Sequence, residues 1–334
     1  MKGIFVLLSG YIDESVSKGQ KMFTLSALVG VGDEWQVLSD DWQNMLAEEN
    51  CRLRQEGRRT LSRYHASECN ALDNEFEGWN KQEQIAFTVK MLELIKQYPM
   101  KTIAYTVNLD ALSNAIPDDA DLLATAYSLC TNFLVYGIGK WLLAKHADPA
   151  TRITLIHDRC DYDWVILQQF NNLLRDDSFS ARDFFTTIAP MCWKDCVPLQ
   201  PADLMAYENM KDAERRPKNG KIRRTLELIL GVGDMGALTK IIGSEAMIPM
   251  GPLLKAVAIS RNAASMQMPK STAPEYDKFN KAMDAILRAD PAKVKAEVNA
   301  EIQASTKQRL AKGQRKRGRR SKSPSDAHAS GDMD

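Results

Sequence analysis

Four acidic residues that are far apart in this chain stand where a folded scaffold could bring them together. Each follows an apolar run or opens a helix-like segment, and they are Asp13, Glu68, Asp158 and Asp203. Carboxylate oxygens are the ligands that Mg²⁺ and Mn²⁺ prefer. Two such ions can hold the attacking and leaving oxygens of a phosphodiester. The pattern therefore indicates a divalent-metal site for phosphoryl chemistry.

Two of these acids follow predicted strands. Residues 3–12 and 152–157 are apolar runs, and Asp13 and Asp158 come directly after them. One acid after a strand is usually a turn residue. In α/β sheets, however, ligands bind beyond the carboxyl ends of the strands, so two acids in this position favour a shared site.

The other two acids have competing explanations. Pro201 opens a predicted helix over residues 201–215, and Asp203 falls in its first turn, where the helix dipole alone favours an acid. Its apolar neighbours indicate that this turn faces the end of the sheet. Glu68 stands in His65-Ala66-Ser67-Glu68, which could instead be a helix start with Ser67 as its cap.

The elements that must position these acids alternate between strands and helices. Strands over residues 3–12 and 22–31 form a hairpin around Lys18-Gly19-Gln20. Helical spacing follows from Trp35 to Leu46, and residues 52–63 read as a loop. The later pattern predicts helices over 85–95, 122–145, 164–174, 201–215, 224–230 and 238–242, and strands over 101–109, 152–157 and 184–189. This order predicts a mixed sheet with helices on both faces.

The motifs in this order resemble a known family. They are Tyr-Ile-Asp-Glu-Ser at Tyr11–Ser15, a Phe-Thr-Leu-Ser-Ala-Leu-Val strand, His-Ala-Ser-Glu, the strand-end Asp158 and Leu-Gln-Pro-Ala-Asp-Leu at Leu199–Leu204. Together they resemble the bacterial and phage family called domain of unknown function 3800, which is similar to the ribonuclease H-like nucleases. That family usually continues Asp-Glu-Ser with Gly, where this chain has Val16. A β-branched residue disfavours a positive φ angle, so the turn could differ here.

The resemblance covers about residues 1–215 and implies a ribonuclease H-like domain there. The pattern and composition of the remainder predict a helical extension over 216–306 and a disordered basic tail over 307–334. The resemblance also implies that the four acids are catalytic metal ligands for Mg²⁺ or Mn²⁺. Asp13 would bridge two ions, Asp158 and Glu68 would complete the shell of one, and Asp203 that of the other. Cleavage would leave 5′-phosphate and 3′-hydroxyl ends.

The charge distribution points to a nucleic-acid partner. The 334-residue chain has a net charge of +1, yet residues 307–322 hold nine Lys or Arg and no acid. Without that segment the chain would be acidic. We expect this arm to contact phosphates without choosing a sequence, through Lys312, Arg315, Lys316, Arg317, Arg319 and Arg320. The alternative is a solvated, disordered tail.

Other features exclude some classes of protein. The six cysteines form no disulfide framework and favour a cytoplasmic location. Zinc held by Cys192, Cys196 and Cys69 or Cys160 would lack the usual two-residue spacer. No apolar stretch is long enough to suggest a membrane span. Gly231–Gly236 matches a dinucleotide fingerprint literally, but it follows a predicted helix instead of a strand.

Two histidines and the late helices remain open at this stage. His65 and His157 stand beside predicted ligand acids, where a histidine could orient a water, contact phosphate or be purely structural. Amphipathic segments near residues 276–287 and 290–302 could dock on the core, a partner or a second copy. Two hypotheses follow: a metal-dependent nuclease, or a non-catalytic nucleic-acid-binding or assembly protein on the same scaffold.

Overall fold

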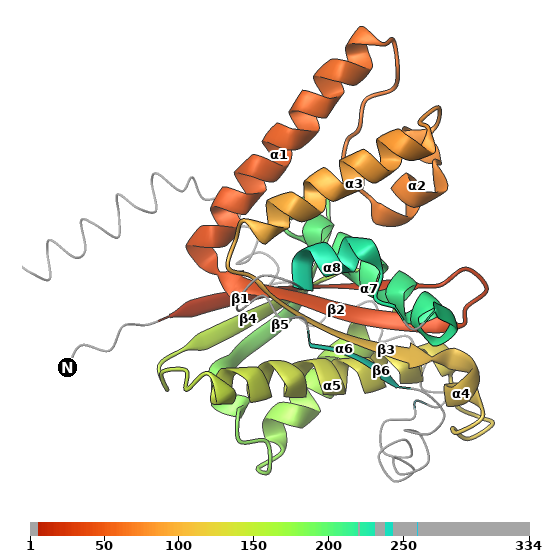
Figure 1. Ribbon diagram of the computed structural model, residues 1–334. Helices are drawn as coiled ribbons and strands as arrows, with labels where there is room; N and C mark the ends of the chain where they lie inside the picture. Colours follow the sequence, from red (N-terminus) through yellow and green to blue (C-terminus); the bar gives the residue numbers. More distant parts are fainter. Residues whose placement is uncertain (1–5, 220, 231–237, 243–258, 260–334) are drawn as a thin grey trace, which may run out of the picture. The chain divides into compact units, whose positions relative to one another are not determined.

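A computed structural model of the chain describes residues 6–219, 221–230, 238–242 and 259, all within one compact unit. The described residues form a mixed sheet with helices on both faces (Figure 1). The strands are β1 (Leu7–Val16), β2 (Met22–Val31), β3 (Lys101–Asn108), β4 (Arg152–Asp158), β5 (Phe185–Met191) and β6 (Leu238–Ile242). The helices are α1 (Gly32–Gln55), α2 (Ala66–Ala71), α3 (Lys81–Lys96), α4 (Leu109–Ser113), α5 (Leu122–Ala144), α6 (Asp163–Arg175), α7 (Leu199–Asn219) and α8 (Arg224–Leu230), with short 3₁₀ turns at Asn74–Phe76 and Arg182–Phe184.

The strand order is β5-β4-β1-β2-β3-β6. β2 pairs antiparallel with both β1 and β3, whereas β4 is parallel to β1 and to β5, and β6 is parallel to β3. The predicted mixed α/β sheet with an N-terminal antiparallel hairpin is therefore confirmed. Since β1 lies between β2 and β4, its carboxyl end is near the centre of the sheet.

The hairpin turn between β1 and β2 explains how Val16 is tolerated. The Ser17 hydroxyl accepts hydrogen bonds from the backbone N–H groups of Lys21, at 3.1 Å, and Met22, at 2.9 Å. The positive φ angles fall at Gly19 and Gln20, while Val16 is the last residue of β1. A β-branched residue at position 16 is therefore compatible with this turn.

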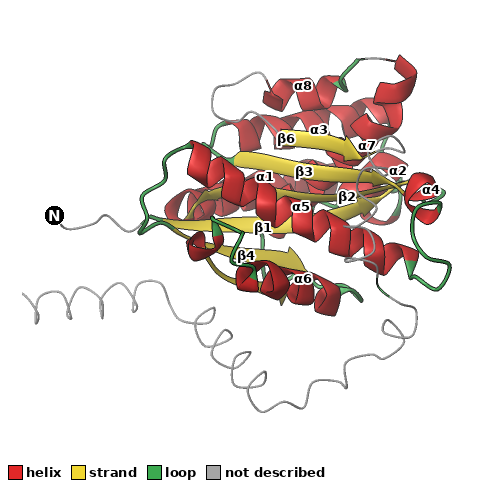
Figure 2. Cartoon of the chain, turned by 90° about the horizontal axis from the view of Figure 1, so that it is seen from below, coloured by secondary structure: helices red, strands yellow, loops and turns green. Residues whose placement is uncertain are grey.

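Two apolar cores lie on the two faces of the sheet. One is formed with α5 and α6, which lie in front of the strands in Figure 2. The other is formed with α1, α3 and α7. Alternate residues of β1 serve the two faces: Leu8 and Ile12 join the first core, and Tyr11 packs against the second.

Helix α5 is long and apolar enough to cross a membrane by length and composition, contrary to our expectation that no segment would be. However, 72% of its most apolar window is buried inside the protein. It has the character of a core helix of a soluble protein, and Gly137 and Gly139 let Tyr105 and Phe179 approach its backbone closely.

Two predicted elements were wrong. Residues 238–242 form β6, the strand beside β3, instead of a helix. Helix α1 continues to Gln55 through the start of the predicted loop, because Leu53 is buried and Arg52 pairs with Glu49 and Glu56 along the helix. The predicted Gly231–Gly236 break, the late helices and the basic arm lie outside the described residues.

Candidate metal centre

Asp13 lies inside β1, not after it as the sequence suggested. The strand continues for three more residues to Val16, and Asp13 is opposite Ser26 of β2. Strand alternation puts its side chain on the same face as Tyr11, whose ring contacts Trp35 of α1 with centroids 4.5 Å apart. Glu14 points to the other face, where Tyr127 of α5 hydrogen-bonds its carboxylate.

Asp158 is the last residue of β4, the strand beside β1. Its Oδ1 accepts hydrogen bonds from the backbone N–H groups of Arg159, at 2.9 Å, and Trp193, at 3.2 Å. The second bond ties the end of β4 to the loop between β5 and α7. Asp158 thus has a fixed position at the carboxyl end of the sheet.

Asp203 lies in the second turn of α7, because that helix begins at Leu199 and not at Pro201. The dipole at a helix start, which favours acids in the first turn, therefore explains this residue less well than expected. Its Oδ2 accepts the backbone N–H of Ala66 at 2.7 Å. Gln200, one turn earlier, accepts the Tyr64 N–H at 2.9 Å and the Trp42 indole N–H at 3.0 Å, so α7 holds the segment before α2 in place.

Three of the four predicted acids line one pocket of about 140 Å³. Asp13, Asp158 and Asp203 contribute to it from β1, β4 and α7, and Glu14 also reaches its wall. The remaining lining residues are Arg63, Tyr64, His65, Trp193, Leu199 and Gln200. The fold thus brings together carboxylates that are up to 190 positions apart in the chain.

The acids of this pocket repel one another. Burial, together with the nearby charges of Asp203, Glu14 and Asp158, raises the pKa of Asp13 well above its usual range. Burial likewise raises the pKa of Asp203 and of Asp158, although Arg63 opposes both shifts. A carboxylate whose pKa is raised by like charges is stabilised by a neighbouring cation.

Glu68 is not among the residues that line the pocket. Its Oε1 lies 3.3 Å from Arg63 Nη2 and 2.9 Å from His65 Nδ1. The predicted helix start is confirmed, because Glu68 lies in the first turn of α2, but the N-cap residue is His65 and not Ser67. Glu68 therefore contacts two residues that line the pocket, Arg63 and His65, and does not line it itself.

His157 belongs to the opposite face of the sheet. Only 2% of its surface is exposed, and its Nδ1 donates to the Asp158 carbonyl oxygen at 2.9 Å and lies 3.5 Å from Asp163 Oδ1. Burial lowers the pKa of its imidazole. Since His157 does not line the pocket, its observed contacts are those of a structural histidine. His65 does line the pocket.

The donor set fits a hard divalent cation in its chemistry. Within the part of the chain that the structure describes, no three His, Cys, Asp or Glu side chains are already arranged around one point as metal ligands. The pocket nevertheless supplies oxygen donors from three separate elements. Asp13 is buried and Asp203 is partly buried, and the charge of Asp203 helps to raise the pKa of Asp13. Such carboxylates suit Mg²⁺ or Mn²⁺ better than they suit zinc.

Several lining residues were not assigned to the site from the sequence, among them an arginine, a tryptophan and a glutamine. Arg63 belongs to the basic stretch that read as a loop, Trp193 stands between two cysteines, and Gln200 was noted only as a neighbour of Asp203. An aromatic residue in a loop carries no periodic signal. Its place beside Asp158 follows from a hydrogen bond between residues 35 positions apart.

Comparison with known proteins adds no family to this description. No protein-family model matches the chain, and no curated protein is similar to it. The pocket itself and the sequence motifs are therefore the features that indicate a function.

Proposed function

We propose that this protein is a metal-dependent nuclease that hydrolyses phosphodiester bonds of nucleic acid. The observation that carries the proposal is that Asp13, Asp158 and Asp203, from three elements, line one pocket. Carboxylates gathered at the carboxyl end of a sheet are suited to hold divalent cations. The raised pKa of Asp13 is further support, because burial and the charges of Asp203, Glu14 and Asp158 disfavour its ionised form, which a bound cation would stabilise.

The architecture is consistent with the resemblance to the ribonuclease H-like nucleases. A mixed sheet that begins with an antiparallel hairpin and carries helices on both faces is the fold which that resemblance implies. In the proposal Asp13, at the centre, lies between Asp158 on one side and Asp203 on the other. Glu68 acts through Arg63 and His65, unless its side chain turns into the pocket when a cation is bound.

The chain's own residues would prepare the reaction by binding and orientation. Bound Mg²⁺ or Mn²⁺ would supply a water of lowered pKa and stabilise the charge that develops on the phosphate oxygens. Gln200 and the Ala66 N–H keep α7 and the segment before α2 in register around Asp203. The Trp193 N–H orients the Asp158 carboxylate in the same way. Hydrolysis would break the P–O3′ bond, in accord with the products that the resemblance implies.

Replacement of Asp13 by Asn tests the proposal. The amide preserves the shape of the side chain but removes its charge, so cleavage of a labelled oligonucleotide with Mn²⁺ should fall by about a thousandfold or more, which corresponds to several kcal/mol of lost stabilisation. Asp183→Asn is the control, because the Asp183 side chain is 91% exposed. Chelator should abolish cleavage by the parent protein. If Asp13→Asn cleaves as fast as the parent, the proposal is wrong.

The same assay addresses the non-catalytic alternative. A protein that only binds or assembles on nucleic acid would retain oligonucleotide binding but show no metal-dependent cleavage of single-stranded, duplex or hybrid substrates. We therefore expect the parent protein to cleave at least one of these substrates with Mn²⁺. An absence of cleavage of all three, by protein that still binds them, would favour the alternative.

A further inference from the structure

An arginine and a tryptophan from distant parts of the chain stack on each other at the acidic pocket. The guanidinium carbon of Arg63 lies 3.9 Å from the centroid of the Trp193 ring. Arg63 belongs to the segment before α2 and Trp193 to the loop between β5 and α7, and both line the pocket that holds Asp13, Asp158 and Asp203. Neither residue is fully buried.

Both side chains are held in position relative to the acids. The backbone N–H of Trp193 donates to Asp158 Oδ1 at 3.2 Å, and the indole ring packs against the small cluster that contains Ile156 and Leu199. Arg63 is held at 3.3 Å from Glu68 Oε1, and its Nη2 lies 3.1 Å from His65 Nδ1. This arrangement fixes an indole ring and a guanidinium group next to the three acids.

The charges at this place change sign over a short distance. Arg63 lines the pocket together with the acids, and Lys194 lies close to the same indole, with Nζ 5.5 Å from the ring centroid. Lys194 is exposed. A phosphate next to the acids could therefore reach a guanidinium group, which forms paired hydrogen bonds with phosphate oxygens.

We propose that Arg63 and Trp193 form a nucleotide subsite that accepts an unpaired base beside the reacting phosphate. The base stacks on the indole in the place that the guanidinium occupies in the free protein, and the displaced Arg63 binds the adjoining phosphate. Aromatic side chains bind single strands in this way because every base has a π-face. The bases of an intact duplex are already stacked, so the substrate is single-stranded nucleic acid or an unpaired end.

This inference rests on the proposed function for the identity of the reacting phosphate, but its binding test does not require cleavage. The measurement is fluorescence anisotropy of the full chain in chelator, with a labelled single strand, the same strand with one abasic nucleotide, and the corresponding duplex. Trp193→Ala should weaken single-strand binding by about tenfold to a hundredfold. Trp193→Phe, which keeps a ring, should stay close to the parent. Tyr136→Ala removes another exposed ring, on α5, and should have no effect.

The abasic ligand separates direct stacking from an effect on folding. In the parent protein, an abasic nucleotide at the stacked position should weaken binding about as much as Trp193→Ala does. The variant and the abasic strand combined should lose little more affinity than either change alone. Any phosphate contacts of the basic C-terminal segment are the same for the normal and the abasic strand, so they cancel in the ratio of the two dissociation constants. Arg63→Ala should weaken binding of the normal and the abasic strand alike.

The outcomes distinguish the two proposals. If no abasic position weakens binding by the parent, or if Trp193→Ala binds the single strand as tightly as the parent, the subsite is wrong even where cleavage is observed. If the parent fails to bind single strands, the subsite is also wrong. If binding depends on Trp193 but no substrate is ever cleaved with Mn²⁺, the subsite stands and the proposed nuclease activity fails.

Discussion

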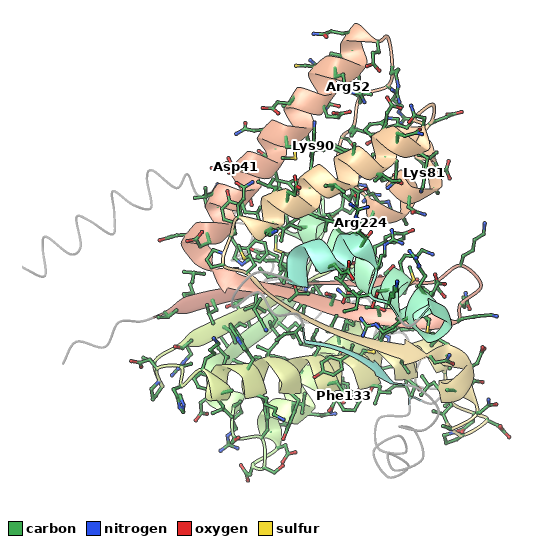
Figure 3. All side chains as sticks on the ribbon, in the orientation of Figure 1. Asp41, Arg52, Lys81, Lys90, Phe133 and Arg224 are labelled. Atoms are coloured by element: carbon green, nitrogen blue, oxygen red, sulfur yellow. The ribbon has the colours of Figure 1, made fainter. Side chains whose placement is uncertain are left out.

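Two regions on the same face of the sheet, the acidic pocket and an arginine–glutamate network, use carboxylates in opposite ways. The arginine–glutamate network joins the end of α1 to α3 and consists of Glu49, Arg52, Glu56, Arg58 and Glu83. Figure 3 shows Arg52 near the end of α1 that points away from the sheet. In the network each carboxylate lies within 3.1 Å of a guanidinium nitrogen, whereas in the pocket Asp13, Asp158 and Asp203 accept hydrogen bonds from backbone N–H groups.

The pKa shifts express this difference. Hydrogen bonds from Arg58, the backbone of Asn80 and Arg52 lower the pKa of Glu83 to about 2. In the pocket, burial and neighbouring acids raise the pKa of Asp13 instead. Acids that are satisfied by cations of the chain stabilise the fold. Acids left without such cations destabilise it, and this cost is expected at sites that bind a cation or do chemistry.

The largest contrast should come from the same acid-to-amide change made in both regions. Asp203→Asn keeps an oxygen that can accept the Ala66 N–H, but it removes a charge from the pocket, so cleavage should fall by about a thousandfold. Glu83→Gln, on α3, should leave cleavage unchanged. The measurement is the initial rate with Mn²⁺ on the substrate that the parent cleaves fastest. Equal losses of rate in the two variants would show that the comparison is wrong.

Part of this picture could be predicted from the sequence. The β1–β2 hairpin follows from two apolar runs around a Gly-containing turn, and the end of β4 at Asp158 follows from the alternation before it. The position of Asp13 inside β1 could not be predicted, because Asp13-Glu14-Ser15 is a polar run that is more typical of a turn. Strand β6 was missed since a five-residue segment with three apolar residues is too short for its periodicity to distinguish a helix from a strand.

The pairing of Glu68 was the least accessible feature. Its sequence neighbours allowed a ligand or a helix start, but its actual partners, Arg63 and His65, depend on how the segment before α2 folds against Asp203 and Gln200. That segment and α7 are more than 130 positions apart. Interactions at this range follow from tertiary packing and leave no local pattern in the sequence.

The next contrast concerns stability within the network. Arg58 bonds to Glu83 at 2.7 Å and to Glu56 at 3.0 Å, and its guanidinium carbon lies 5.4 Å from the centroid of Trp79. Arg58→Ala should therefore lower the free energy of unfolding by about 1–2 kcal/mol. Arg54→Ala, which removes an exposed arginine from the same stretch of chain, should change it by less than about 0.5 kcal/mol. Urea unfolding followed by circular dichroism measures both variants.

The smallest expected effect is an opposite dependence of folding stability on pH for Asp13 and Glu83, measured without metal. Because the folded state raises the pKa of Asp13, the protein loses stability as pH rises above about 4, where the unfolded carboxyl ionises. Asp13→Asn should thus melt above the parent at pH 7. The lowered pKa of Glu83 acts oppositely, since its stabilisation is present above about pH 4 and is lost as pH falls towards about 2.

Glu83→Gln should accordingly melt below the parent at pH 7, by a few degrees for about 1 kcal/mol. Both differences should shrink as pH falls towards 3. The Asp13 carboxyl is then neutral like its amide replacement, and the Glu83 carboxyl of the unfolded state takes up a proton, which removes part of the stabilisation of the folded state. Melting curves between pH 3 and pH 7 in chelator measure the effect. A variant at position 13 that is less stable than the parent at every pH would contradict the interpretation of the pocket as a region of unrelieved repulsion.

The most direct test of the central claim is calorimetric titration of the parent protein and of Asp158→Asn with Mn²⁺. If the pocket is a metal centre, the parent should bind the ion in a saturable manner, and the variant should bind it at least about 100-fold more weakly. Glu83→Gln should bind as the parent does. Absence of Mn²⁺ binding by the folded parent, or equal binding by Asp158→Asn, would contradict the account.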